Sequence, residues 1–124
     1  MQNQEQFLMV VTTCPDNETA HLVANKIIER SLAACVNILP EVVSIYQWKG
    51  ERQQGTEHIL LIKTEKSRYT ELQNLITESH PYELPEVIAV PISEALPEYL
   101  SWIKSAILDS AIDREANKLS HEKK

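Results

Sequence analysis

Glycine is scarce in this chain. Two glycines occur among 124 residues, whereas average usage of about 7% would give roughly nine. Neither G-x-G-x-x-G nor G-x-x-x-x-G-K-[ST] is present, so a glycine-rich loop that cradles a nucleotide phosphate is excluded. With 43% hydrophobic and 24% charged residues, the composition is that of one ordinary folded domain and not of a disordered chain.

Basic residues and long apolar runs are also scarce. Twelve Lys and Arg against 18 Asp and Glu give a net charge of −6, and the basic residues are scattered. Binding to nucleic acid or to an anionic membrane surface needs clustered positive charge, so neither partner is expected. No segment approaches the roughly 20 apolar residues of a membrane span. The apolar stretch from Phe7 to Val11 is too short for a signal peptide, and we therefore predict a cytoplasmic protein.

Metal-binding motifs are absent as well. The two cysteines, Cys14 and Cys35, form no C-x-x-C pair and no disulfide-rich framework, so reduced thiols are expected. The four histidines form no H-x-x-x-H or H-E-x-x-H motif, which excludes a dedicated zinc or iron motif. We therefore expect that no cofactor is required.

What the chain does contain is an alternation of strand-like and helix-like segments. Compact apolar and β-branched runs predict strands, and apolar residues at three- and four-residue spacing predict amphipathic helices. The expected strands are Phe7 to Thr13, Ala34 to Leu39, Glu41 to Trp48 after Pro40, Thr56 to Thr64, and Val87 to Ile92. The expected helices run from Asn17 to Leu32 with Asp16 as N-cap, from a Ser67 cap to about Ser79, and from Pro97 onward. A turn over residues 49–55 holds both glycines.

This order, β-α-β-β-α-β with a terminal helix, predicts a ferredoxin-like α+β fold. Right-handed crossovers place two helices on one face of an antiparallel sheet. The two middle strands form a long hairpin, because each arm exceeds the usual strand length of about 5–6 residues. We expect a single domain over residues 1–124, folded from about 7 to 108, with a polar tail at about 109–124 that frays.

The first arm of this hairpin carries large apolar side chains on both faces, namely Val43, Ile45, Tyr46 and Trp48. A small domain with helices on one side cannot bury both faces, and an exposed apolar strand invites pairing with another chain. Either the terminal helix or another copy of the chain must cover it. Because that helix supplies only one apolar stripe, we predict that these four residues form an oligomer interface.

Six short strings occur in a distinctive order and spacing. They are Cys14-Pro-Asp16, Leu32-Ala-Ala-Cys-Val-Asn-Ile38, Ser44-Ile-Tyr-Gln-Trp-Lys-Gly50, Lys63-Thr64, His80-Pro-Tyr-Glu-Leu-Pro-Glu86 and Tyr99-Leu-Ser-Trp102. Over about Phe7 to Ser105 the chain thereby resembles the CutA family of divalent-cation tolerance proteins. The resemblance implies a role in metal tolerance or response. It also implies a ferredoxin-like homotrimer, similar to the PII signalling proteins, whose hairpin strands extend across subunit boundaries.

The resemblance also raises the question of copper. Some family members are described as binding copper through a cysteine in the first strand and two adjacent histidines before the Pro-Tyr pair. The matching positions here are Thr12, Ser79 and His80, of which only His80 is a soft-metal donor. Cys14 lies two residues beyond Thr12 on the same strand face and could substitute. His80 and Cys14 are therefore the candidate ligands for Cu²⁺ or another divalent cation, although the two missing donors favour an indirect role.

Both candidate ligands have a second interpretation. His80 could instead cap the preceding helix, whose C-terminus favours a protonated imidazole, and a structural role is the commoner one for a lone histidine. Cys14 precedes a helix N-terminus and is expected to have a stabilised thiolate. A Cys- or His-dependent enzyme would still need a base and an oxyanion site, and no spacing specifies either. We therefore predict a non-enzymatic protein.

A cleft between subunits is a second candidate site, by analogy with PII-like sensors of small anions or metabolites. Lys63 could hold an anion there. The other candidates, Tyr82, Glu83 and Glu86, follow His80 in a proline-bounded segment. The alternative interpretation is a lysine that extends along the sheet edge together with solvent-exposed acids.

Overall fold

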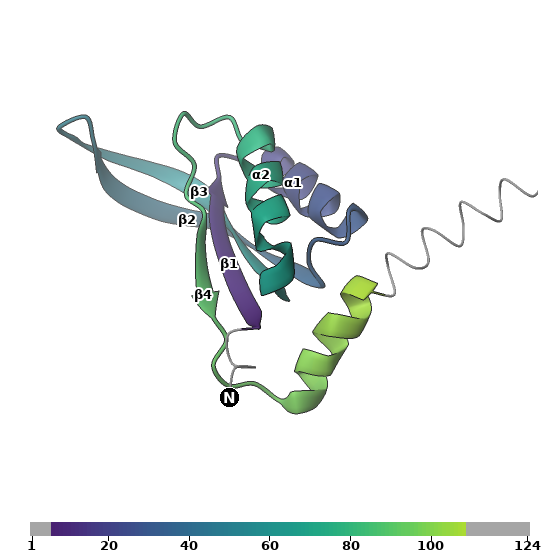
Figure 1. Cartoon of the computed structure of the whole chain (residues 1–124). Helices are drawn as coiled ribbons and strands as arrows, with labels where there is room; N and C mark the ends of the chain where they lie inside the picture. Colours follow the sequence, from purple (N-terminus) through teal and green to yellow (C-terminus); the bar gives the residue numbers. More distant parts are fainter. Residues whose placement is uncertain (1–5, 109–124) are drawn as a thin grey trace, which may run out of the picture.

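The computed structural model describes residues 6–108 of the chain (Figure 1). In chain order its elements are β1 (Phe7–Cys14), α1 (Asn17–Glu29), β2 (Cys35–Trp48), β3 (Glu51–Glu65), the short 3-10 helix η2 (Lys66–Arg68), α2 (Tyr69–Ser79) and β4 (Ile88–Pro91). A further helix begins at Pro97, as predicted, and is described to residue 108. The predicted tail at about 109–124 lies outside the described residues.

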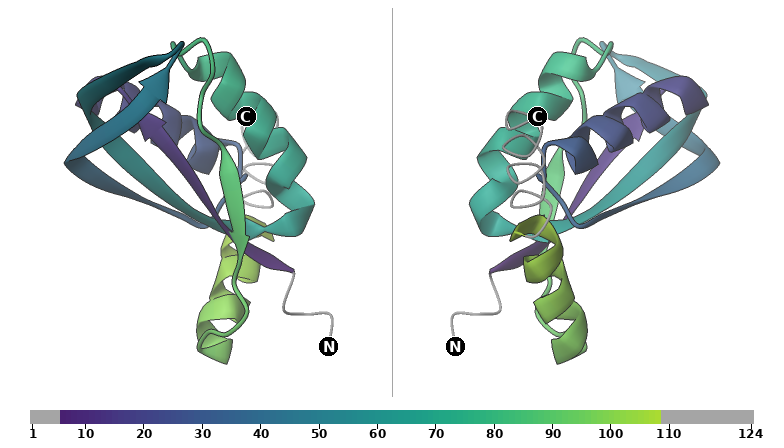
Figure 2. Two further views of the ribbon diagram at one scale, coloured as in Figure 1. Left: turned by 90° about the vertical axis from the view of Figure 1, so that its left-hand side faces the viewer. Right: turned by 90° about the vertical axis from the view of Figure 1, so that its right-hand side faces the viewer.

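The four strands form one antiparallel sheet in the order β2-β3-β1-β4. α1 and α2 cover one face of the sheet, and the helix over residues 97–108 lies at one end of it (Figure 2). This arrangement confirms the ferredoxin-like α+β fold that the element order predicts. No helix within residues 6–108 is both long and apolar enough to cross a membrane.

The main core lies between the sheet and these two helices. Alternate side chains of β1 and β3 and the apolar stripes of the helices are fully buried there, among them Val10, Leu60, Ile62, Val23, Ile27, Leu72 and Ile76. Burial of each such side chain stabilises the fold by roughly 1.5–3 kcal/mol. A second cluster packs Ile103 and Ile107 of the last described helix against Phe7, so this helix closes the end of the sheet.

The first helix begins where the sequence predicts and ends earlier. The Asp16 carboxylate caps α1 by accepting a hydrogen bond from the backbone N–H of Thr19 at 2.7 Å. α1 ends at Glu29, before the predicted Leu32, and Ser31 adopts a left-handed conformation with a φ of 56°. Leu32 still packs in the core, which explains why it matched the helical apolar pattern.

Two other boundaries differ from prediction. Ser67 does not cap a helix: it lies inside η2, and α2 begins at Tyr69 with no side-chain cap hydrogen bond. A 3-10 turn of this kind is common at helix N-termini, and it takes the place of a capping serine. β4 covers only Ile88–Pro91 of the predicted residues 87–92.

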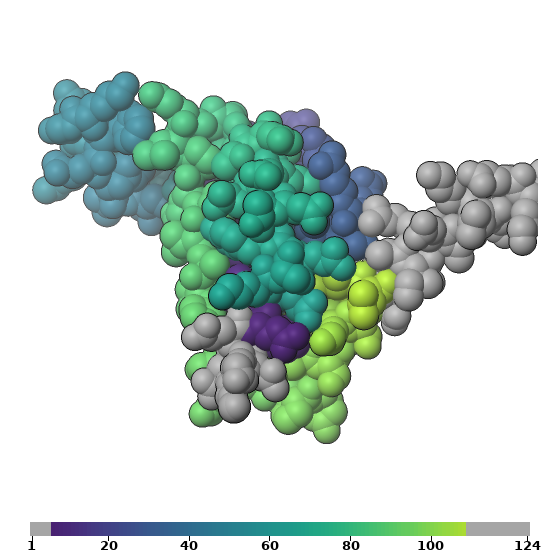
Figure 3. Space-filling view, viewed as in Figure 1, coloured from purple at the N-terminus to yellow at the C-terminus, as the bar shows by residue number. Residues whose placement is uncertain are grey.

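β2 and β3 form a longer hairpin than predicted. The segments on either side of Pro40 are one strand, whose ladder shifts register between Leu39 and Val42. Proline has no N–H to donate to the ladder, so a bulge is the expected way to accommodate it. Glu41 within the bulge has a φ of 56°. Beyond the bulge, the two arms project past the rest of the molecule (Figure 3).

The turn of the hairpin is correspondingly shorter than predicted. It consists of Lys49 and Gly50, with φ values of 53° and 82°. Positive φ at both positions is the conformation of a tight two-residue hairpin turn. β3 already starts at Glu51, so Gly55 lies within the strand opposite Ser44. The prediction of a turn up to residue 55 is therefore wrong.

The sheet face opposite α1 and α2 carries a run of apolar side chains beside the polar pair Lys63 and Asn37. The strand register places Met9 beside Val90, and Val11 between Leu61 and Ile88, on this face. Val90 and Ile88 are 45% and 50% exposed. We call this surface, which the described part of the chain leaves open, the open sheet face. An apolar surface of this kind typically marks an interaction site.

Candidate functional site

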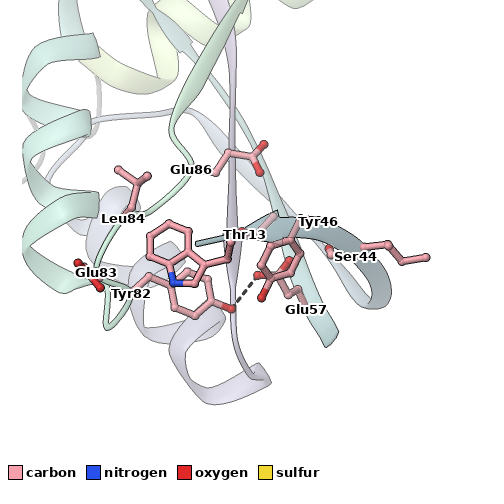
Figure 4. A pocket seen from close by; sticks show the side chains of 10 residues that line it. Thr13, Ser44, Tyr46, Glu57, Tyr82, Glu83, Leu84 and Glu86 are labelled. Atoms are coloured by element: carbon pink, nitrogen blue, oxygen red, sulfur yellow. Dashed lines mark hydrogen bonds between the residues drawn. The ribbon is translucent and has the colours of Figure 1, made fainter. Parts of the chain in front are cut away.

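A cavity of about 660 Å³ lies between the hairpin and the α2–β4 loop (residues 80–87) (Figure 4). This volume is within the usual range of small-molecule sites. The lining residues come from β1, the hairpin and the loop: Thr13, Ser44, Ile45, Tyr46, Trp48, Glu57, Tyr82, Glu83, Leu84 and Glu86. The structure thus brings together three of the predicted cleft residues, Tyr82, Glu83 and Glu86.

Glu57, on β3, contributes a hydrogen-bonded carboxylate to the cavity. Its Oε2 accepts a hydrogen bond from the Tyr82 hydroxyl at 2.7 Å (Figure 4), and Ser44 and Thr13 line the same cavity. Burial raises the pKa of Glu57, but the nearby polar side chains of Ser44, Tyr82, Thr13 and His80 lower it by more, so the pKa lies below its usual value. Glu57 is therefore ionised at neutral pH.

Tyr82 is the matching neutral donor. Burial, followed by the hydrogen bond to Glu57 and the charge of that carboxylate, raises the pKa of Tyr82 well above its ordinary range. The hydroxyl therefore keeps its proton at any physiological pH. Tyr82 also belongs to a second contact, because its ring centroid lies 4.6 Å from that of His80.

His80 fastens the α2–β4 loop to β1. Its Nε2 bonds to the carbonyl oxygen of Thr13, and its Nδ1 accepts from the backbone N–H of Tyr82 at 3.2 Å. A carbonyl only accepts and an N–H only donates, so these partners assign the neutral imidazole with its proton on Nε2. The side chain is buried, with 8% exposure. The geometry favours a structural role, through a β1 carbonyl and not through the protonated helix cap that the sequence suggested.

Cys14 is buried in the core between the sheet and the helices. This burial, and then the charges of Asp16 and Glu57, raise the pKa of the thiol to about 11. The expectation of a stabilised thiolate is therefore wrong, because desolvation outweighs any benefit from the nearby start of α1. Cys14 carries its proton at neutral pH.

The residues at the copper positions of the family do not fit a copper site. Thr12 and Ser79 offer only hydroxyls, both ring nitrogens of His80 already have hydrogen-bond partners, and the Cys14 thiol is protonated. Copper prefers thiolate and imidazole ligands. Among residues 6–108, no group of three or more His, Cys, Asp or Glu side chains is placed to hold a metal ion.

Lys63 lies apart from the cavity within one chain. It is six residues further along β3 than Glu57, a distance of about 20 Å at roughly 3.3 Å per residue. Its ammonium group donates a hydrogen bond to Oδ1 of Asn37 on the neighbouring β2. A site that combined Lys63 with Tyr82, Glu83 and Glu86 would therefore need a second chain.

A different lysine lies at the rim of the cavity. The Nζ of Lys49 is 5.5 Å from the centroid of the Trp48 ring and 3.9 Å from Oε1 of Glu83. The side chains of Lys49 and Glu83 are 70% and 75% exposed, so the ion pair contributes at most about 1 kcal/mol. The contact nevertheless places an ammonium group between an indole and a carboxylate.

The four predicted interface residues lie on both faces of the hairpin arm, as the sequence indicates. Tyr46 and Trp48 alternate with Val43 and Ile45 along β2. Val43 and Ile45 are 64% and 65% exposed. Tyr46, Trp48 and Ile45 also line the cavity, a role that the sequence did not predict for them.

Glu57 has no sequence signature of its own. It stands in a polar part of β3, and its partners Thr13, Ser44 and Tyr82 come from three other parts of the chain. An indirect signal was available, because Ser44 and Tyr82 both lie in strings that carry the family resemblance. Only the fold brings them to the same cavity as Glu57.

Together, the sheet order, the long hairpin and the cavity beneath it define a ferredoxin-like α+β protein with a candidate site for a small ligand. Residues 8–106 match the family described as CutA1 divalent ion tolerance protein, and the chain belongs to this family. The resemblance of the six strings is thereby confirmed.

Individual relatives agree with this assignment. The chain is 45% identical over 91 residues to "Protein CutA homolog" of Xenopus laevis, which covers 73% of this chain and 60% of that protein. It is 42% identical over 96 residues to the divalent-cation tolerance protein CutA of Thermus thermophilus, covering 77% and 93%. The structure of CutA1 from Shewanella sp. SIB1 aligns with a TM-score of 0.80 and 41% identity over 83% of this chain and 96% of that one. The chain thus spans about three-fifths of the Xenopus relative.

Proposed function

We propose that the chain is a homotrimeric, non-enzymatic protein that contributes to tolerance of divalent cations. The observation that carries this proposal is the open sheet face, which one chain exposes and several copies would bury. The trimer is the assembly that the family resemblance implies. The role in tolerance follows from membership of a family described by that property.

The open sheet face supports assembly because of its composition. Val11, Leu61 and Ile88 are neighbours on adjacent strands, and Val90 follows on β4. Exposed apolar area costs roughly 25 cal/mol per Å² relative to burial, which favours packing against a second copy. The edge position of β4 adds unpaired backbone groups beside these side chains.

The hairpin supports the same proposal. Val43 and Ile45 project on the part of the hairpin that extends past the rest of the molecule (Figure 3). Both side chains are more than half exposed in one chain. A partner chain would bury these two side chains. It would also cover the far part of the hairpin, which extends past the other described residues of its own chain.

Sedimentation velocity of the full chain tests the assembly. We expect the mass of three chains for the wild type. Ile88→Lys, which puts a charge on the open sheet face, should shift the protein toward single chains. Leu22→Lys is the matched control, because Leu22 on α1 is 51% exposed and lies away from that face. A wild type that sediments as a single chain would rule out the trimer.

We further propose that tolerance does not depend on copper held by His80 and Cys14. The engaged nitrogens of His80 and the protonated thiol of Cys14 support this, as they support a non-enzymatic role. Titration calorimetry with Cu²⁺ should give only weak binding, and Cys14→Ser should leave it unchanged. Tight binding that Cys14→Ser and His80→Ala both abolish would overturn the proposal.

A second candidate function is that of a PII-like sensor that binds a small molecule. The cavity of about 660 Å³ between the hairpin and the α2–β4 loop favours it. Native mass spectrometry of the protein as purified from cells tests it, since a bound metabolite would add its mass to the assembly. Spectra that contain only protein, both as purified and after incubation with candidate metabolites, would argue against this function.

A further inference from the structure

We propose that the cavity between the hairpin and the α2–β4 loop binds a small organic cation through an ammonium group. The cationic nitrogen would lie against the Glu57 carboxylate, and its carbon substituents against the rings of Tyr46, Trp48 and Tyr82. This inference rests on the second candidate function, a small-molecule site in the cavity, and its test is read out separately from the number of chains in the assembly.

The first argument is a negative charge without a counter-ion. The nearby His80 already uses both ring nitrogens, on the Thr13 carbonyl and the Tyr82 N–H. The Glu57 carboxylate instead accepts a hydrogen bond from the Tyr82 hydroxyl, a neutral donor. Such donors keep a carboxylate ionised but do not cancel its charge. No Lys or Arg among the described residues forms an ion pair with Glu57. The charge is therefore available to a cationic ligand.

The charge of the whole lining points the same way. Glu57, Glu83 and Glu86 contribute three carboxylates, and none of the ten lining residues is Lys, Arg or His. An anion would meet repulsion from these three carboxylates, and the Lys49 ammonium at the rim is already paired with one of them, Glu83. The cavity therefore selects against the anionic ligand that the PII analogy suggested.

The aromatic part of the lining distinguishes an organic cation from a metal ion. Tyr46, Trp48 and Tyr82 line the same cavity as Glu57, and aromatic faces attract ammonium groups through their quadrupoles. A metal ion instead needs several converging ligands at short range, and among the described residues no three acidic, His or Cys side chains, the three lining carboxylates included, are placed to hold one. A volume of about 660 Å³ also greatly exceeds that of a bare ion.

The rim of the cavity already holds an ammonium group in this kind of environment. Nζ of Lys49 lies 5.5 Å from the Trp48 ring centroid and 3.9 Å from Oε1 of Glu83. The chain itself therefore pairs a primary amine with one indole and one carboxylate of the lining. A ligand amine beside Glu57 would likewise meet one aromatic ring, that of Tyr82, and one carboxylate, that of Glu57.

Titration calorimetry with two probes of similar size tests the proposal on the full chain. We expect n-butylammonium to bind the wild type at least tenfold more tightly than neutral 1-butanol. Glu57→Gln, which keeps the shape and removes the charge, should weaken n-butylammonium at least tenfold. Glu78→Gln on the exposed surface of α2 is the matched control and should bind like the wild type. Equal affinity for the two probes, binding of neither, or an unchanged affinity in Glu57→Gln would overturn the proposal.

Two further measurements complete the test. If Glu57→Gln does not fold, as judged by circular dichroism, Trp48→Leu replaces it and should weaken n-butylammonium by at least fivefold without affecting 1-butanol. Tighter binding of inorganic phosphate than of n-butylammonium would contradict a cation site while leaving a small-molecule sensor intact. Sedimentation of the same samples reports the assembly separately, so failure of the trimer and failure of the cation site are distinguishable.

Discussion

At the scale of single residues, Glu57 shows how neutral groups stabilise a charge. Interactions with Ser44, Tyr82, Thr13 and His80 together outweigh the desolvation of its carboxylate. Polar groups that favour the ionised form lower the pKa of a carboxylate. The hydrogen bond from Tyr82 also ties the α2–β4 loop to β3.

The lowered pKa of Glu57 predicts a pH dependence of stability. Its pKa is below the unfolded value of about 4.3, so the unfolded state takes up protons first as pH falls. The stabilisation is therefore complete above that unfolded pKa and is lost as pH drops through the lower, folded pKa. We expect the difference in unfolding free energy between wild type and Glu57→Gln to shrink between pH 6 and pH 3, measured by urea denaturation. For Glu78→Gln the difference should stay constant, and a constant difference for Glu57→Gln would contradict the assignment.

Local sequence signals singled out three residues that the structure brings together, although their role in a cleft between subunits stays a prediction. Tyr82, Glu83 and Glu86 sit in a proline-bounded string, and the structure places all three on the cavity. Glu57 could not be predicted, because its environment is made by residues distant in sequence. The prediction of a thiolate at Cys14 was wrong because a position before a helix does not reveal whether the side chain is buried.

At the scale of elements, the hairpin and the α2–β4 loop form the two sides of the cavity. The hairpin turn depends on Lys49 and Gly50 with positive φ, and the loop depends on the bonds of His80 to Thr13 and Tyr82. Each side is thus fixed by a few local contacts, which single substitutions can test.

Alanine substitutions at the two glycines are expected to have different effects on the unfolding free energy. Gly50 has a φ of +82°, a conformation that costs an L-residue about 1–2 kcal/mol. Gly50→Ala should therefore lower the unfolding free energy by about 1 kcal/mol. Gly55 lies in β3 without a positive φ, and a Cβ added there would meet only open space, so Gly55→Ala should be neutral or slightly stabilising. Chemical denaturation of both variants checks this, and equal losses would contradict the two-residue turn.

The hydrogen bonds of His80 are expected to anchor the α2–β4 loop, so its removal should destabilise the loop. His80→Ala removes partners of the Thr13 carbonyl and the Tyr82 N–H, which should cost about 1–3 kcal/mol of unfolding free energy. Hydrogen exchange at the Tyr82 amide should also become faster in the variant. The exposed His21 on α1 offers a control, since His21→Ala should change neither quantity by a comparable amount. An unaltered exchange rate at Tyr82 in His80→Ala would refute the anchoring role.

Element boundaries show where sequence patterns are informative. Asp16 and Pro97 are predicted correctly as the cap and the start of helices, because both signals depend on local backbone chemistry. Pro40 predicts the end of a strand, although the ladder continues through a bulge. Whether the hydrogen-bond ladder continues past a proline depends on the partner strand. A local sequence pattern carries no information about that partner.

At the scale of the whole molecule, the element order was sufficient to predict the ferredoxin-like sheet, and six strings were sufficient to predict the family. Within residues 6–108, two apolar regions are nevertheless left exposed, the open sheet face and the far part of the hairpin. The proposed trimer accounts for both with one assembly.

Native mass spectrometry of the full wild-type chain tests this account most directly, because it counts the chains in each ion. At micromolar concentration and neutral pH, the account predicts a dominant species of three chains. A spectrum dominated by single chains under the same conditions would contradict it, since the open sheet face would then remain exposed to water.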